Sequence, residues 1–330
     1  MNYIGSKQRL APWIVENVRN SLGDKPLRNA VVADVFAGTG QVGRAFKPLV
    51  KRVIANDLER YAYVLNRHYI GNTAAMEFPV LNGAPVCGPF LRNFTEDSEP
   101  PRKYYTRENA MLIDGLRLEI ETLRADGAVS DDQYFWLLTS LVESADAVAN
   151  TASVYGAFLK AFKKTALRPL AFGPASHVIT GQENEVFHED ANALVRRISG
   201  DVLYMDPPYN ARQYGANYHV LNRLVEGEDE AHQNVSQKVT GLGDYERSAY
   251  CRKREAEEAM EDIVAAADFG LVAISYNNEG IIPEERFRAI LEAHGDYRVV
   301  RKEYQRFKAD SAREAAADKT FEFLHLLKKS

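Results

Sequence analysis

The tetrapeptide Asp206-Pro207-Pro208-Tyr209 has residue types and a spacing that suit a reaction on a planar amine. It follows the apolar run 201–205, which is typical of a buried strand, and open α/β sheets bind ligands at the carboxyl ends of their strands. The two prolines make the turn rigid and remove two backbone donors. A carboxylate and a carbonyl that accept the N–H bonds of an exocyclic amine would orient its lone pair toward an electrophilic methyl group. A strand-end aspartate in a purely structural turn is the alternative.

A glycine loop follows another apolar run, 31–36, and has the form Gly38-Thr39-Gly40-Gln41-Val42-Gly43. Asp57 ends the next such run, roughly 20 residues further on, as in the dinucleotide-binding fingerprint. An NAD-dependent oxidoreductase is therefore one interpretation, and a tight structural turn is another. Asp34, inside the first run, suits the cationic amino group of a methionine moiety better than a pyrophosphate, which favours S-adenosylmethionine as the ligand.

The order of the apolar and amphipathic segments predicts an α/β fold with a mostly parallel sheet and a late antiparallel edge strand. Residues 1–73 and 178–330 are expected to form this domain, and residues 74–177 an inserted, mainly helical subdomain. Helices are expected at Arg107–Leu123 and, after a Ser130 N-cap, at Gln133–Val148. Further helices are expected at 41 onward, 60–69, 191–198, 252–267 and 284–293, with later strands at 271–276, 297–304 and 320–327.

The composition is that of an ordinary globular protein, with 45% hydrophobic and 26% charged residues among 330. The two cysteines, Cys87 and Cys251, lie far apart, and the histidines lack ligand-like spacing, so no metal site is predicted. No signal peptide or apolar membrane span is recognisable, so a cytoplasmic location is expected. The net charge of −5 disfavours a non-catalytic DNA-binding module.

The order of these motifs resembles the alpha group of DNA adenine N6-methyltransferases, the Dam-like group of bacterial restriction–modification systems. The matching segments are Tyr3-Ile4-Gly5-Ser6-Lys7, Asp34 to Gly40, Asn56-Asp57, Asp190 and Asp206 to Tyr209. The resemblance implies a Rossmann-like methyltransferase sheet with the block 74–177 as its target-recognition region. It also implies that S-adenosylmethionine contacts Tyr3, Lys7, Phe36, Gly38, Asp57 and Asp190, next to the Asp34 and Gly40 of the loop.

The same resemblance implies that Asp206, Pro207 and Tyr209 hold an adenine flipped out of double-stranded DNA, with Pro208 completing the turn. A cognate restriction endonuclease is a possible partner, and a monomer is expected because one methylation event needs one subunit. Cytosine N4, RNA adenine and protein glutamine remain alternative acceptors; the aspartate at position 206 favours DNA adenine by resemblance alone. The charged stretch 211–258 is either part of the recognition region or a loop.

Overall fold

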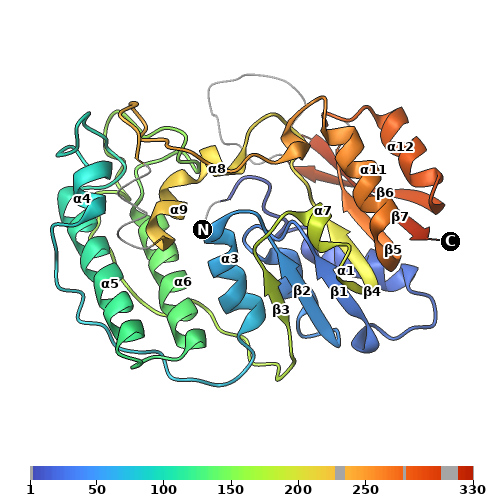
Figure 1. Ribbon diagram of the computed structural model, residues 1–330, viewed down its shortest axis with the longest axis horizontal. Coiled ribbons are helices and arrows are strands. Elements are labelled where there is room, and N and C mark those ends of the chain that lie inside the picture. Colours follow the sequence, from blue (N-terminus) through green and yellow to red (C-terminus); the bar gives the residue numbers. More distant parts are fainter. Residues whose placement is uncertain (1–2, 227–234, 278–279, 306–318, 330) are drawn as a thin grey trace. The chain divides into compact units, whose positions relative to one another are not determined.

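The computed structural model describes residues 3–226, 235–277, 280–305 and 319–329, and the chain divides into two compact units (Figure 1). Unit 1 consists of Met1–Gly5, Glu59–Gly181 and Tyr214–Glu246. Unit 2 consists of Ser6–Leu58, Gln182–Gln213 and Arg247–Ser330. Within the described residues, no helix combines the length and the apolar character needed to span a membrane.

Unit 2 is built on a seven-stranded sheet in the order β3-β2-β1-β4-β5-β7-β6 (Figure 1). Its strands are β1 (Val31–Asp34), β2 (Arg52–Asn56), β3 (Glu185–Phe187), β4 (Ser199–Met205), β5 (Asp268–Ser275), β6 (Gly295–Gln305) and β7 (Lys319–Lys329). The first five strands pair in parallel, whereas β7 runs antiparallel to both β5 and β6. The predicted α/β class is confirmed, and the antiparallel strand lies one position inside the edge.

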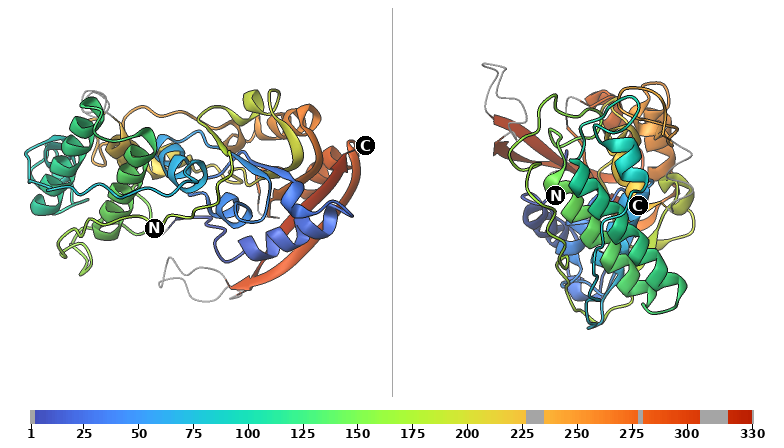
Figure 2. Two further views of the ribbon diagram at one scale, coloured as in Figure 1. Left: turned by 90° about the horizontal axis from the view of Figure 1, so that it is seen from below. Right: turned by 90° about the vertical axis from the view of Figure 1, so that its left-hand side faces the viewer.

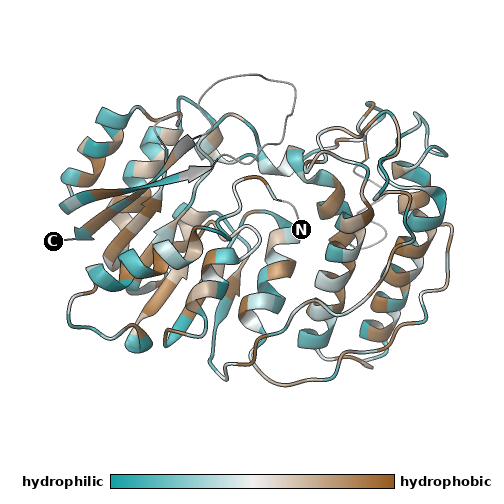
Figure 3. Cartoon of the chain, turned by 180° about the vertical axis from the view of Figure 1, so that it is seen from behind, coloured by the Kyte–Doolittle hydropathy of each residue, from teal (hydrophilic) through white to brown (hydrophobic). Residues whose placement is uncertain are grey.

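Helices cover both faces of this sheet, because its central strands are apolar on both sides (Figure 3). The helices of unit 2 are α1 (Ala11–Ser21), α2 (Gln41–Phe46), α7 (Ala191–Leu194), α11 (Ala256–Ala266) and α12 (Glu284–Glu292), with short 3-10 turns at Leu27–Asn29 and Ala249–Cys251. Side chains of α7, α11 and α12 share one apolar cluster with the sheet. On the opposite face α1 lies along β6, where Arg298 donates to the Ser21 hydroxyl at 2.7 Å (Figure 2).

Unit 1 is helical, and its core is rich in aromatic side chains. Its helices are α3 (Arg60–Asn66), a π-helical turn (Arg67–Gly71), α4 (Pro89–Phe94), α5 (Arg107–Ala125), α6 (Asp131–Val148), α8 (Tyr214–Asn217) and α9 (His219–Val225). The Ser130 N-cap is confirmed: its hydroxyl accepts from the Gln133 amide at 3.2 Å, and the Gln133 side chain accepts from the Ser130 amide in return.

The helical unit reaches beyond the block 74–177 at both sequence ends. Helix α3 belongs to it because its backbone is tied to other helices of the unit: the Tyr61 amide donates to Asn222 at 3.1 Å, and the Thr139 hydroxyl donates to the Val64 carbonyl at 3.3 Å. Tyr214–Glu246, which contains α8 and α9 and makes up most of the stretch 211–258, also belongs to it. Helix α1 was not predicted, since it follows a polar terminus and begins with Ala11-Pro12.

Candidate active site

The parallel strands of unit 2 end at one edge of the sheet, and this edge collects the acidic residues singled out in the sequence. Asp34, the last residue of β1, is in register with Tyr204 of β4, so Asp206 follows only two residues beyond it. Asp57 comes directly after β2, whose register with β1 pairs Ala55 with Asp34. The fold thus brings three predicted carboxylates, far apart in the sequence, to the edge where such sheets bind ligands.

The glycine loop is closed by the carboxylate after β2. Gly38 and Gly40 have φ angles of +52° and +73°, a region that favours glycine, and α2 starts directly after Gly40. The Gly38 amide donates to Asp57 Oδ2 at 2.7 Å, and the Ala37 amide donates to the Asn56 carbonyl at 2.9 Å. The pattern therefore shapes a tight turn at the sheet edge, with Asp57 holding one of its amides.

Asp34 is a buried carboxylate with an unsatisfied oxygen. Its side chain is 1% exposed, it accepts backbone hydrogen bonds from Phe36 and Gly43, and Oδ1 has no hydrogen-bond partner among the described residues. Burial, and then the negative charges of Asp206 and Asp57, raise the pKa of Asp34 well above its usual range. A buried acceptor of this kind fits a ligand ammonium, so the residues present suit the amino group of S-adenosylmethionine.

Asp206 is paired with Lys7, which the resemblance places beside the cofactor. Lys7 Nζ lies 2.9 Å from Asp206 Oδ1 and 3.2 Å from Glu322 Oε1 of β7, and the Lys7 side chain is only 7% exposed. Burial alone would lower the pKa of Lys7, but the two carboxylates raise it well above its usual range. Burial raises the pKa of Asp206 to about 6; Lys7 opposes this shift, and Glu322 adds to it.

The turn at 206–209 is anchored on the loop after β5. The Ile281 amide donates to the Tyr209 carbonyl at 3.0 Å, and the half-buried Tyr209 ring meets Tyr276 edge-on, with centroids 6.4 Å apart. Tyr276 is itself stacked on Phe287 of α12 at 4.6 Å. Tyr209, the residue predicted to stack on the base, therefore has its backbone carbonyl held by a hydrogen bond and its ring packed against Tyr276.

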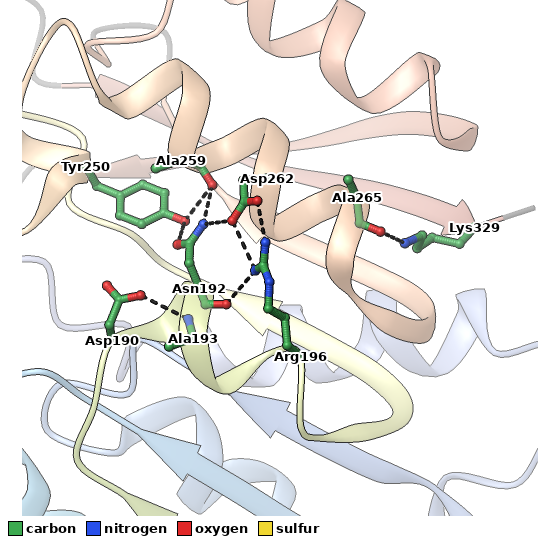
Figure 4. Close-up of polar contacts among 9 residues, drawn as sticks. All are labelled: Asp190, Asn192, Ala193, Arg196, Tyr250, Ala259, Asp262, Ala265 and Lys329. Carbon is green, nitrogen blue, oxygen red and sulfur yellow. Dashed lines mark hydrogen bonds and ion pairs between the residues drawn. The ribbon is translucent and has the colours of Figure 1, made fainter.

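Phe36 meets a residue that was not predicted, Tyr250, which also contacts the helix that Asp190 caps. Asp190 is exposed and caps α7 through a 3.0 Å bond from the Ala193 amide, and Tyr250 donates to Asn192 at 2.7 Å (Figure 4). The Tyr250 ring also meets Phe36 edge-on at 5.0 Å. Its only signal in the sequence is that Ala249-Tyr250-Cys251 interrupts a charged stretch.

Asn192 and Arg196 fix α7 against α11 around the same tyrosine. The Asn192 amide donates to the Ala259 carbonyl and to Asp262, each at 2.8 Å, and Arg196 forms an ion pair with Asp262 at 2.5 Å (Figure 4). Helix α7, which Asp190 caps, is therefore tied to α11.

Tyr3 is the one predicted site residue that belongs to unit 1. Its hydroxyl lies 2.9 Å from that of Tyr61, and its ring stacks on Tyr218 with centroids 4.7 Å apart. The remaining predicted site residues, together with Glu322 and Tyr250, all belong to unit 2.

Known proteins match the chain over most or all of its length. A family model described as D12 class N6 adenine-specific DNA methyltransferase matches residues 3–290. The chain is 45% identical to the Type II methyltransferase M.NlaIII of Neisseria lactamica, with 100% of both chains covered. It is 36% identical to M.CviAII of Paramecium bursaria Chlorella virus 1 (94% of this chain, 93% of the relative) and 32% identical to M.FokI of Planomicrobium okeanokoites (96% and 51%).

Proposed function

Because this chain belongs to the D12 class of N6 adenine-specific DNA methyltransferases, we propose that Asp206, Pro207, Pro208 and Tyr209 hold the adenine amine that it methylates. The enzyme transfers a methyl group from S-adenosylmethionine to N6 of adenine in DNA. The observation that carries the proposal is the Asp206 carboxylate, which lies at the carboxyl edge of the sheet with Lys7 2.9 Å from one oxygen.

Asp206 would activate the amine by accepting one of its N–H bonds. The lone pair of adenine N6 is delocalised into the ring, so an acceptor on the N–H makes that lone pair more available for attack. With a pKa of about 6, the Asp206 carboxyl is mainly ionised at neutral pH and therefore ready to accept. Once N6 carries the new methyl group, the same carboxylate is placed to take up the proton that the nitrogen loses.

The cofactor residues follow from the same edge of the sheet. S-adenosylmethionine supplies the electrophilic methyl group on its sulfonium. The unpartnered Oδ1 of Asp34 supports a role in holding the cofactor's amino group. We place the remainder of the cofactor site at residues that share this edge or the adjoining α7 cap: Phe36, Gly38, Gly40, Asp57 and Asp190.

The position of Tyr209 supports the flipped-base part of the proposal. Its ring is half-buried and backed edge-on by Tyr276, which leaves it suited to stack on a base that has left the duplex. Replacing Tyr209 by alanine is expected to weaken binding to adenine-containing DNA, whereas phenylalanine, which keeps the ring, is expected to preserve it. Equal binding by the alanine and phenylalanine variants would show that the Tyr209 ring does not stack on the base.

The decisive experiment replaces Asp206 by alanine. We expect the rate of methyl transfer to fall about a hundredfold to a thousandfold, because a preorganised polar contact to the reacting group is lost. The product is identified by digesting methylated DNA to nucleosides and analysing them by mass spectrometry. Asp268→Ala, which removes an exposed carboxylate at the opposite end of β5, is the matched control. Full activity in Asp206→Ala would refute the proposal. N4-methylcytosine in the product would show that adenine is not the methyl acceptor.

The helical unit 1 is proposed to read the target sequence, as the block 74–177 was expected to do. A cognate restriction endonuclease and action as a monomer are also proposed; the first is supported by relatives named Type II methyltransferases. Sequencing DNA from cells that express the protein should show N6-methyladenine in one short motif, and sedimentation should give the mass of one chain. Methylation without a sequence preference would contradict the proposal of a cognate restriction endonuclease.

A further inference from the structure

Glu322 contacts the same buried lysine, Lys7, that contacts Asp206, although it lies far from every predicted motif in the sequence. Lys7 Nζ is 3.2 Å from Glu322 Oε1 and 2.9 Å from Asp206 Oδ1, and all three side chains are at most 18% exposed. An ammonium has three hydrogens, so it can bond both carboxylates at once. Glu322 also lies beyond residue 290, where the match to the family model ends.

We propose that Glu322 is a positioning residue that shares the Lys7 ammonium with Asp206 and so keeps the Asp206 carboxylate a strong acceptor for the target amine. The proposal rests on the proposed role of Asp206. Among the described residues only Lys7 bonds to the Asp206 carboxylate, which leaves Oδ2 for the adenine. Without Glu322, the full positive charge of Lys7 would act on Asp206 alone.

The direction of this effect follows from the charges around Asp206. The titratable groups that face the Asp206 and Lys7 pair are Asp34 from β1, Tyr204 from β4 and Glu322 from β7, and Asp57 acts on Asp34. Burial is the largest cause that raises the pKa of Asp206; Lys7 lowers it and Glu322 raises it. Removing the charge of Glu322 must therefore lower the pKa of Asp206, whereas removing that of Lys7 must raise it.

The test is a direct titration of Asp206 in the protein without cofactor or DNA. Aspartate labelled with ¹³C at its carboxyl carbon is incorporated, and the Asp206 resonance is identified by its loss in Asp206→Asn. The wild-type midpoint is expected at about pH 6. In Glu322→Gln, which keeps the side-chain shape, it should fall by on the order of one pH unit, and in Lys7→Met it should rise.

Two further variants separate charge from structure. Glu322→Asp keeps the negative charge and should stay closer to the wild-type midpoint than Glu322→Gln does. Glu303→Gln, the same chemical change at an exposed site on the neighbouring β6, should leave the midpoint unchanged. A thermal melt of each variant shows whether it is folded, so a misfolded variant is recognised before its titration is interpreted.

An unchanged or raised midpoint in a folded Glu322→Gln variant would overturn the proposal. So would a shift of equal size in Glu303→Gln. The titration needs neither substrate, so its result does not depend on methyl transfer. If Asp206→Ala kept full activity, the proposed role of Asp206 would be refuted, but the electrostatic coupling among Lys7, Asp206 and Glu322 could still be measured. If Asp206 is the acceptor and Glu322 is coupled to it, the fall in kcat at acidic pH should begin at a lower pH in Glu322→Gln than in the wild type.

Discussion

At the scale of single residues, the unsatisfied Oδ1 of Asp34 connects cofactor binding to stability. Asp34→Asn should weaken binding of S-adenosylmethionine about tenfold to a hundredfold, since it removes a charge-assisted hydrogen bond. Isothermal titration calorimetry measures this, with Asp268→Asn, at an exposed site, as the control. Unchanged affinity in Asp34→Asn would separate Asp34 from the ammonium of the cofactor.

The same substitution should make the cofactor-free protein more stable. The pKa of Asp34 is higher in the folded than in the unfolded protein, so the unfolded state releases its proton first as pH rises. The free energy of unfolding therefore falls as the pH rises from about 4 toward the folded-state pKa, and it stays lower above it. Asparagine lacks this ionisation, and thermal unfolding at pH 7 should give a higher melting temperature than for the wild type.

Asp206 sets the expected pH dependence of methyl transfer. Its pKa of about 6 means that the carboxylate acceptor is lost by protonation below that pH. We expect kcat/KM to fall about tenfold for each pH unit below 6, as one essential ionised group requires. The profile is measured at saturating S-adenosylmethionine. Asp206→Asn should be slower than the wild type, and its kcat/KM should not fall in this way below pH 6. A wild-type rate that stays constant from pH 7 to pH 5 would contradict the assignment.

At the scale of elements, the cationic segment 150–168 connects α6 to the rest of the chain without forming a helix or strand of its own. Asn150 holds it: its side-chain amide donates to the Leu159 carbonyl at 3.1 Å, and its Oδ1 accepts from the Lys163 amide at 3.0 Å. Lys160, Lys164 and Arg168 are exposed on this anchored loop, which suits contact with DNA phosphates.

Replacing Lys160, Lys164 and Arg168 together by glutamine should weaken DNA binding and its salt dependence. Each lost phosphate contact should reduce the slope of log K against log salt by about 0.9. Fluorescence anisotropy over a range of salt concentrations measures that slope. Lys51→Gln, which neutralises an exposed cation of unit 2, is the control. If the triple variant kept the wild-type slope, the loop would not contact phosphates.

The sequence predicted those parts of the candidate site that depend on short segments. Asp34, the glycine loop and Asp206 could be singled out because each lies at the end of an apolar strand, and the structure brings these strand ends to one edge of the sheet. Glu322 was missed because its contact with Lys7 spans 315 residues and depends on β7 lying beside β5. No local pattern encodes that placement. Tyr250 was missed for a similar reason, since only the packed structure brings it to Phe36.

At the scale of the whole molecule, the predicted cofactor residues are unevenly divided between the two units. All of the predicted cofactor residues except Tyr3 belong to unit 2. S-adenosylmethionine at a hundred times its Kd adds about 2.7 kcal/mol to the stability of the state that binds it. Hydrogen exchange should therefore slow most in β1, β2 and the glycine loop of unit 2, and less in α5 and α6 of unit 1. Asp34→Asn should show little slowing at the same concentration, and equal slowing in both units would contradict this division.

The buried, half-satisfied carboxylate of Asp34 also has a consequence for the life of the protein in the cell. Without its methyl donor, the enzyme has a buried carboxyl group with an unpaired oxygen, which costs stability, so it should open more often and be exposed to proteases for longer. When the donor is plentiful, binding suppresses that opening. The amount of enzyme in the cell would then follow the supply of S-adenosylmethionine, and a culture starved of methionine should lose the enzyme by degradation.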